Sequence, residues 1–385
     1  MRIGIDGTPA INDIRAIQRY TGNLIRELSN IDHDNLYSIL CLGCKKSINK
    51  PFSDIYNPKF SIITSNFPGK ILKTSWSLTG YPKFSSWING KVDILHFPGG
   101  YAYVPTSGEK VLTTLHGFHH QIIPHRANEK FKATVLNMLD KTIRLSNNII
   151  TVSETNKREL MEIWNVPGDK ITPIPLGIST EFRQIEISEN DKISFLSRYS
   201  LKNKPFILYV GALEPHKNID GIISAYSILG NDFYKHFNLV LIGAETEYLD
   251  KYKRMISNFH ISEYVSFINY ITPGSEDLTW FYNLAELFVF PSFYEGWASP
   301  PLESFKCGTP ALVSDIPSLR ESTGGTTCYC NPNDPEDIAS KVILMIEDHT
   351  LYKEILFKGL DFAMKCTWQK CARQTLELYK SAAQS

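Results

Sequence analysis

The sequence predicts an α/β fold with two domains, each built on a parallel β-sheet. Its 385 residues are too many for one ordinary hydrophobic core, and two domains of roughly 180 residues are expected instead. Short apolar runs typical of buried strands alternate with stretches of helical periodicity, which is the pattern of a parallel sheet covered by helices. A polar, weakly periodic stretch at 178–204 separates two such series, and we place the linker there.

The apolar runs and the periodic stretches between them give the elements in order. In the N-terminal domain, 1–178, we predict strands at 2–6, 36–42, 59–63, 92–97, 110–115 and 148–152, and helices at 18–30, 127–146 and 154–165. In the C-terminal domain, 205–365, we predict strands at 205–211, 238–243, 264–268, 286–291 and 310–314. The helices predicted there are 218–230, 249–259, 277–284, 301–307, 335–348 and 351–364. A final helix is predicted at about 368–381.

The composition favours a cytoplasmic enzyme. Hydrophobic residues make up 43% of the chain, and no apolar run approaches the roughly 20 residues that span a bilayer. The first residues read as a strand and not as a signal peptide. Seven cysteines, an odd number, favour reduced thiols over a disulfide framework.

Neither the cysteines nor the histidines predict a metal site. Cys41 and Cys44 have the spacing of metal ligands, but no second pair of suitable spacing matches them. Four histidines fall within ten residues, but no carboxylate joins them at ligand spacing. They are His116, His119, His120 and His125.

Charge is uneven although the net charge is zero. Residues 1–180 hold 21 Lys and Arg against 14 Asp and Glu, so the first half is basic and the second acidic. Within the first half, 69–91 interleaves lysines with aromatic residues, a pattern that suits an anionic membrane surface. Peripheral contact at the inner face of the plasma membrane is one interpretation, and an amphipathic segment packed on its own domain is the other. No motif indicates nucleic-acid binding.

A loop between two predicted elements carries the clearest functional signal. The strand at 286–291 leads into PSFYEGWASPPLE (291–303), which opens a helix at the two prolines. Ser299 is placed to cap that helix. Glu295 then lies beyond a strand end and Glu303 in a first helical turn. Because ligands of open α/β sheets bind outside the carboxyl ends of strands, this pair predicts a binding site.

The same segment resembles the signature of the family 4 retaining glycosyltransferases, which have two Rossmann-like domains facing across a cleft, the GT-B architecture. The match continues through CGTP (307–310), and three further segments occur in family order. They are TLHGFHHQIIPH (114–125), IITVSETNKREL (149–160) with ITPIPLGISTEF (171–182), and ILYVGALEPHKNIDGIISAY (207–226). The resemblance covers nearly the whole chain. It implies that the final helix, about 368–385, packs back on the N-terminal domain.

The resemblance assigns roles to the charged residues. Glu303 matches the residue that binds the ribose hydroxyls of the donor, and Glu295 matches a residue beside the transferred sugar. Lys217, just before a predicted helix, would stabilise the departing diphosphate, because the helix N-terminus adds partial positive charge. His216 would supply further charge if protonated. His116 matches a histidine near the transferred sugar.

Backbone groups complete the predicted donor site. Gly211 ends a strand and allows the diphosphate to approach. The loop of Gly296, Trp297, Ala298 and Ser299 offers N–H groups to sugar and phosphate. Tyr270, in Asn269–Ile271, matches the segment that holds the nucleobase.

Three positions depart from the family pattern. Ala212 stands where the family commonly has an arginine beside the diphosphate. Ala16 and Gln18 replace the two glycines of a loop that approaches the same group.

The sequence therefore predicts a retaining hexosyltransferase that needs no metal or other cofactor. We expect a nucleotide-sugar donor, with GDP-mannose favoured and a UDP-sugar as the alternative, and a lipid-linked or oligosaccharide acceptor in O-antigen or other surface-polysaccharide biosynthesis. Two other functions stay open: a catalytically weakened partner of another transferase, and a sugar-nucleotide epimerase.

Overall fold

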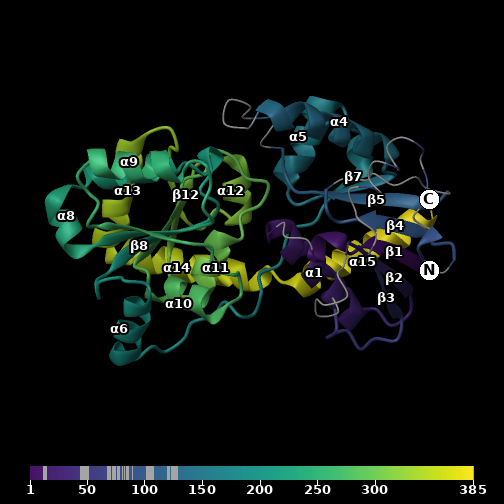
Figure 1. The fold of residues 1–385 in the computed structure, drawn as a ribbon, viewed down its shortest axis with the longest axis horizontal. Coiled ribbons are helices and arrows are strands. Elements are labelled where there is room, and N and C mark those ends of the chain that lie inside the picture. The colour runs from purple at the N-terminus through teal and green to yellow at the C-terminus, as the bar shows by residue number, and fades with distance from the viewer. Residues whose placement is uncertain are drawn as a thin grey trace. The chain divides into compact units, whose positions relative to one another are not determined.

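The structure, a computed structural model, describes residues 1–11, 15–43, 52–66, 71, 75, 79, 81, 83, 86–88, 90–100, 108–118, 122 and 129–384. The chain divides into two compact units (Figure 1). Unit 1 comprises Met1–Gln121, Asn128–Gly177 and Thr367–Ser385. Unit 2 comprises Ile122–Ala127 and Ile178–Cys366.

The described part of unit 1 is built on a seven-stranded parallel sheet of order β3-β2-β1-β4-β5-β6-β7. Every neighbouring pair of its strands runs parallel. The chain order reverses between β1 and β4, which makes that junction the switch point of a doubly wound sheet. The strands are β1 (Arg2–Asp6), β2 (Leu36–Leu42), β3 (Phe60–Ser65), β4 (Ile94–Phe97), β5 (Lys110–Leu115), β6 (Asn148–Thr151) and β7 (Ile171–Pro173).

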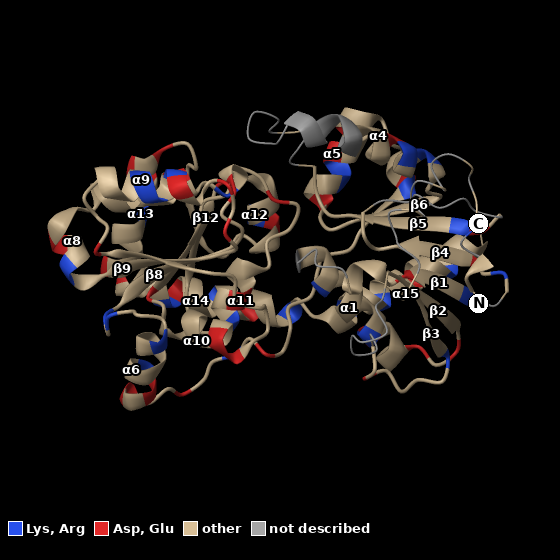
Figure 2. Ribbon diagram, in the orientation of Figure 1, with Lys and Arg blue, Asp and Glu red and all other residues tan. Residues whose placement is uncertain are grey.

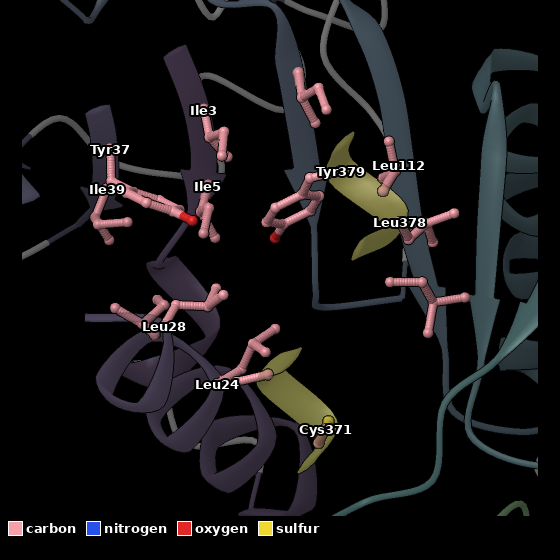
Figure 3. Packing of buried hydrophobic residues seen from close by; sticks show 14 of the residues in the cluster. Ile3, Ile5, Leu24, Leu28, Tyr37, Ile39, Leu112, Cys371, Leu378 and Tyr379 are labelled. Atoms are coloured by element: carbon pink, nitrogen blue, oxygen red, sulfur yellow. The ribbon is translucent and has the colours of Figure 1, made fainter. Parts of the chain in front are cut away.

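One face of this sheet is covered by α1 (Arg15–Ile31) and α15 (Trp368–Gln384), which come from the two ends of the chain and contact each other. Buried residues of α15 recur at helical spacing, from Trp368 through Cys371 to Tyr379, and line one side of the helix. Figure 3 shows Leu378 and Tyr379 of α15 among sheet residues such as Ile5. Unit 1 also contains α4 (Glu129–Leu145), α5 (Glu154–Trp164) and the short helices η1 (Thr8–Ala10) and η4 (Gly168–Lys170).

Unit 2 contains a six-stranded parallel sheet of order β10-β9-β8-β11-β12-β13. Its strands pair in parallel throughout, and its switch point lies between β8 and β11. The strands are β8 (Phe206–Val210), β9 (Asn238–Ile242), β10 (Val265–Ile268), β11 (Leu287–Phe290), β12 (Ala311–Ser314) and β13 (Cys328–Cys330). β9, β11 and β12 are buried at every position, as expected for strands covered on both faces.

Helices flank the sheet of unit 2 on both faces (Figure 1). Before and around the first strands lie α6 (Glu189–Arg198), η5 (Pro215–Lys217), α7 (Ile219–Ile228), α8 (Gly230–His236) and α9 (Leu249–Asn258). They are followed by α10 (Glu276–Leu284), α11 (Pro300–Lys306), α12 (Pro317–Ser322), α13 (Pro335–Glu347) and α14 (His349–Lys365).

These two parallel-sheet units confirm the predicted fold class. Besides the three short 3-10 helices, five described strands and α-helices are absent from the prediction: β7, β13, α6, α8 and α12. The two strands are three residues long, too short to stand out as apolar runs. Gly230 reads as the end of a helix, yet its positive φ of 81° turns the chain directly into α8. The stretch 178–204 is not wholly irregular, because Ser188 caps α6 there.

The segment 69–91 lies largely outside the described residues. Of its described positions, Trp87 and Ile88 pack on a hydrophobic cluster of unit 1, whereas Tyr81 is 62% exposed.

Among the described residues, none of the helices combines the length and apolarity that a membrane crossing requires. Figure 2 shows acidic and basic residues interspersed along many helices. In α14 they form the ion pairs Glu354–Lys358 and Asp361–Lys365.

The metal hypotheses rest partly on residues that are not described. Cys44, His119, His120 and His125 lie outside the described residues. Within the described part of the chain, no group of three or more His, Cys, Asp or Glu side chains is arranged to hold a metal ion. None of the described cysteines, Cys371 among them, is joined in a disulfide.

Candidate active site

The predicted donor-site loops lie at the switch point of unit 2. β8 and β11 are neighbours in the sheet, with Phe288 opposite Leu208. The loop after β8 leads to Gly211 and Lys217, and the loop after β11 leads to Glu295. Parallel strands end at one edge of the sheet, so the topology brings these loops together at the edge where α/β sheets bind ligands.

Lys217 and Glu295 form a largely buried ion pair. Nζ of Lys217 donates to both carboxylate oxygens of Glu295, at 2.6 Å to Oε1 and 2.8 Å to Oε2. Their side chains are only 17% and 9% exposed. The ammonium also lies 5.4 Å from the ring centre of Phe290 on β11. The two predicted catalytic groups of unit 2 therefore lie in direct contact, and each neutralises the charge of the other.

Hydrogen bonds to backbone carbonyls hold the two loops together around this pair. The N–H of Phe293 donates to the carbonyl of His216 at 2.9 Å. The side-chain amide of Asn218 donates to the carbonyls of Pro291, at 3.0 Å, and Pro332, at 2.7 Å. Lys217 thus sits between two residues that are each bonded to the segment after β11.

Asn218 also begins α7. It adopts a left-handed conformation, with φ 61°, and its Oδ1 accepts a bond from the N–H of Gly221 at 3.1 Å. Asparagine tolerates this conformation better than most residues, and it is a preferred N-cap. The sequence prediction started the helix at 218 but assigned Asn218 no part in the site.

His216 is brought next to an acidic neighbour. Its side chain is 9% exposed, and Nδ1 lies 3.3 Å from Oε2 of Glu214. Ala212, where the family commonly has arginine, has its carbonyl bonded to the phenol of Tyr209 at 2.9 Å.

Gly211 is in a tight backbone contact at the ends of β8 and β9. Its N–H donates to the carbonyl of Ile242 at 2.9 Å. A methyl group on Gly211 would lie 2.5 Å from the hydroxyl of Tyr209, and one on Gly243 would lie 2.0 Å from the carbonyl of Gly211. Burial raises the pKa of Tyr209 well above its ordinary value, so the phenol keeps its proton beside Glu295. A methyl group at either glycine would therefore clash with its neighbours in unit 2.

Glu303 is 1% exposed and lies in the first turn of α11. Its Oε2 accepts a hydrogen bond from the phenol of Tyr282 on α10, at 3.0 Å. Tyr282, 21 residues earlier in the chain, was not predicted as a site residue. A spacing of 21 across a strand carries no periodic signal that could have found it.

The loop between the two glutamates is almost fully buried. Ala298 is 1% exposed, Trp297 is 9% exposed, and the indole Nε1 of Trp297 makes no hydrogen bond. Ser299 occupies the position before α11 but has helical φ and ψ of −75° and −37°, and its side chain makes no capping bond. The predicted capping role of Ser299 is therefore wrong. The two prolines that follow it begin the helix without needing bonded N–H groups.

Tyr270 lies apart from this centre within unit 2. It follows β10, which is separated from β8 by β9 in the sheet. Its side chain is 38% exposed, and its N–H donates to Oδ1 of Asn269 at 2.6 Å. This exposure leaves the ring accessible.

His116 belongs to unit 1, where it follows β5. Its Nε2 lies 2.8 Å from the carbonyl of Pro98, so that nitrogen carries the proton. The imidazole meets the ring of Tyr20 edge-on, with centres 4.8 Å apart. Burial lowers the pKa of His116 to about 4, which keeps the ring neutral near pH 7.

A buried chain of polar groups continues from Tyr20. Its hydroxyl lies 3.0 Å from Oγ1 of Thr114, which lies 2.8 Å from Nε2 of His96. Nδ1 of His96 lies 2.6 Å from the hydroxyl of Tyr379 on α15. Burial lowers the pKa of His96 to about 3. These residues were missed because the bond to Tyr379 joins positions 283 residues apart.

The last two departures from the family pattern also lie in unit 1. Gln18, on α1, donates through Nε2 to the carbonyl of Ala10 at 3.3 Å. Ala16, two residues earlier on the same helix, is exposed. Gln18 therefore stabilises the start of α1, a role that glycine cannot have.

Comparison with known proteins shows which families and which individual proteins this chain resembles. Residues 17–182 match the family described as Glycosyltransferase Family 4, and residues 193–356 match Glycosyl transferases group 1. O-antigen chain mannosyltransferase B of Escherichia coli is 28% identical over 308 residues, which are 80% of this chain and 77% of that protein. Serotype-specific mannosyltransferase WbdA of Escherichia coli is 31% identical over 274 residues, 69% of this chain but only 33% of that protein.

A solved structure shares the fold over its whole length. HepE from Anabaena, in complex with UDP and glucose, superposes with a TM-score of 0.69 at 13% identity. The match covers 99% of this chain and 100% of that chain. At this identity the likeness concerns the fold alone.

Proposed function

Because this chain belongs to the glycosyltransferases, with a family 4 domain followed by a group 1 domain, we propose that it transfers mannose from a nucleoside-diphosphate sugar to a growing surface polysaccharide. The mannosyltransferases of O-antigen chains among its relatives support the sugar and the setting. Unit 2 holds the donor and unit 1 serves the acceptor side. The anomeric configuration is retained, as the family resemblance implies.

The observation that carries this proposal is the meeting of Lys217 and Glu295 at the switch point of unit 2. Breaking the sugar–phosphate bond leaves negative charge on the diphosphate, and a fixed ammonium stabilises that charge most where water is excluded. A carboxylate beside the sugar orients hydroxyl groups and stabilises the positive charge that develops at C1. Both groups lie within hydrogen-bond distance of each other, on two loops that are themselves joined by hydrogen bonds.

The reaction follows from these roles. The donor diphosphate takes Lys217 as its partner, and the Glu295 carboxylate turns to the sugar hydroxyls. The C1–O bond to phosphate breaks while an acceptor hydroxyl adds to C1 from the same face. The departing phosphate oxygen takes the proton of that hydroxyl, so no covalent intermediate with Glu295 is needed. Glu303 holds the ribose, because a carboxylate can accept bonds from two neighbouring hydroxyls.

The test is thermal stabilisation of the purified protein by GDP-, UDP-, ADP- and dTDP-sugars without added metal. We expect one nucleotide, GDP, to raise the melting temperature, and the Glu303→Ala variant to lose the shift. Transfer of labelled mannose to an acceptor, with the product anomer read by NMR, then tests the reaction and its stereochemistry. Donor binding without any transfer would support a catalytically weakened partner in its place.

A second part of the proposal concerns the acceptor. We propose a lipid-linked acceptor at the inner face of the plasma membrane, reached through the basic aromatic segment 69–91 of a cytoplasmic protein. Co-sedimentation with vesicles of anionic and of neutral lipid tests it. Equal, negligible binding to both would remove the membrane contact from the proposal and leave the soluble reaction unaffected.

A further inference from the structure

Tyr282 is a fully buried residue whose only polar side-chain atom is directed at Glu303. It lies on α10 and is 0% exposed. Its hydroxyl donates to Oε2 of Glu303 at 3.0 Å. A carboxylate can only accept in this contact, so the direction of the bond is settled. Because Glu303 is itself 1% exposed, its charge relies on protein donors and not on bulk water.

The position of the phenol is fixed from several sides. The ring meets Phe182 edge-on with centres 5.7 Å apart, and Phe288 of β11 with centres 5.5 Å apart. The backbone carbonyl of Tyr282 accepts a bond from the hydroxyl of Thr309. The residue therefore has little freedom, and its hydroxyl points at a fixed place beside α11.

The helix α11 fixes the backbone of Glu303 but not its carboxylate. Its N–H donates to the carbonyl of Ser299 at 2.9 Å, and its carbonyl accepts from Cys307 at 3.1 Å. These bonds leave the side-chain torsions free. The phenol of Tyr282 restrains them.

We propose that Tyr282 is a positioning residue that orients the Glu303 carboxylate for the ribose of the donor nucleotide. The proposal rests on the ribose role of Glu303 given above. A carboxylate held in one orientation binds a vicinal diol without first losing rotational freedom, and a carboxylate released from the phenol does not. Removing only the phenol oxygen therefore weakens the ribose contact while leaving the contacts to base and diphosphate.

The experiment measures how much the ribose hydroxyls add to binding. Dissociation constants of GDP and UDP, each beside its 2′,3′-dideoxy counterpart, are measured by calorimetry on the full-length protein. The ribose ratio is the dideoxy value divided by the ribonucleotide value, for the nucleotide that binds more tightly. Variants are Tyr282→Phe, Glu303→Ala and the control Tyr226→Phe.

Tyr226 is a matched control because it is a buried tyrosine of the same unit. It is 3% exposed, and its hydroxyl donates to the carbonyl of Phe237 at 2.8 Å. Its replacement removes a part-buried tyrosine hydrogen bond that does not involve Glu303. Urea unfolding of both phenylalanine variants checks that their losses of stability are similar.

We expect Tyr282→Phe to lower the ribose ratio about tenfold, as for the loss of one bond to a charged group. Tyr282→Phe should bind the dideoxy nucleotide as tightly as the wild type does. Tyr226→Phe should keep the wild-type ribose ratio. An unchanged ratio in Tyr282→Phe, or equal weakening of both nucleotides, would overturn the positioning role. A Glu303→Ala variant with the wild-type ratio would instead overturn the ribose role itself, so the two failures are distinguishable.

Discussion

Lys217 and Glu295, the two groups that we propose act on the donor, also stabilise each other in the fold. Each is mostly removed from water, and each has the other as a charged partner at 2.6 Å. Removing one member of such a pair leaves an uncompensated buried charge, whereas removing both does not. Activity and stability therefore respond differently to single and double substitutions here.

We expect Lys217→Ala to lower the free energy of unfolding by about 3 kcal/mol, because Glu295 is left unpaired. The same variant should lose transfer activity by about 100-fold or more, because the leaving diphosphate loses its cation. Adding Glu295→Gln should restore most of the stability and none of the activity. Urea unfolding and initial rates measure the two effects. Recovery of activity together with stability would contradict the proposed role of Lys217.

His116 gives a pH dependence of known sign. Burial holds its folded pKa at about 4, below the ordinary value of 6.5. The unfolded chain therefore binds the proton more readily, and the stability due to the neutral ring is complete above pH 6.5 and falls as pH drops towards 4. His96 acts in the same direction.

Between pH 6.5 and 4.5 the His116→Gln variant should lose about 2 kcal/mol less of its free energy of unfolding than the wild type does. Denaturant titrations at several pH values measure this. His349→Gln serves as the control, since His349 begins α14 and is exposed. Parallel curves for wild type and His116→Gln would show that the imidazole is not held neutral by burial.

The start of α7 joins three parts of unit 2 through one side chain. Asn218 caps the helix and donates to the carbonyls of Pro291 and Pro332. It does so in a left-handed conformation that costs most other residues about 1 kcal/mol.

Asn218→Ala should therefore destabilise the protein by about 3 kcal/mol, through loss of the cap, two unsatisfied carbonyls and backbone strain. Asn218→Gly should cost about 1 kcal/mol less, since glycine adopts the left-handed conformation freely. Equilibrium unfolding of both variants in urea checks the order. If alanine proved the milder substitution, the strain at this position would be misassigned.

Strands and long helices were predictable because each leaves a local pattern. β1, β2 and β5 begin and end at the predicted residues, since buried parallel strands are rich in apolar residues. Three-residue β7 and β13 leave no such pattern. α12 was missed because it is six residues long and starts at a proline after a strand, where a loop is equally consistent.

The candidate site was predictable only as far as its local motifs reach. Glu295 and Glu303 share one short segment, and Lys217 lies in another. They come together because the sheet order places β8 beside β11, although 76 residues lie between the end of β8 and the start of β11. The contacts of Glu303 with Tyr282 and of His96 with Tyr379 depend on packing between distant elements, and no spacing rule predicts them.

The two units differ in which segments of the chain form them. Apart from the short piece Ile122–Ala127, unit 2 is one continuous stretch, Ile178–Cys366, which contains Lys217, Glu295 and Glu303. Unit 1 needs α15, whose buried residues complete its core. A large apolar side chain contributes about 1.5–3 kcal/mol when buried.

A fragment of residues 178–366 should therefore fold alone and bind the same nucleoside diphosphate as the full chain, with an affinity within about tenfold. A fragment of residues 1–177 should remain unfolded or aggregate without α15. Circular dichroism, thermal melts and calorimetry of both fragments test this. Cooperative melting of 1–177 by itself would show that α15 is dispensable to its core.

The return of α15 to unit 1 also sets the order of events during synthesis. A domain usually folds once its own residues have been made, N-terminal first. Here residues 178–366 are made between the two parts of unit 1. At usual rates of translation that interval lasts roughly 10 to 40 s. Unit 2 is therefore complete on the ribosome before unit 1, although most of unit 1 precedes it in the chain. Until the final helix emerges, the hydrophobic face of unit 1 that α15 will cover stays exposed to chaperones.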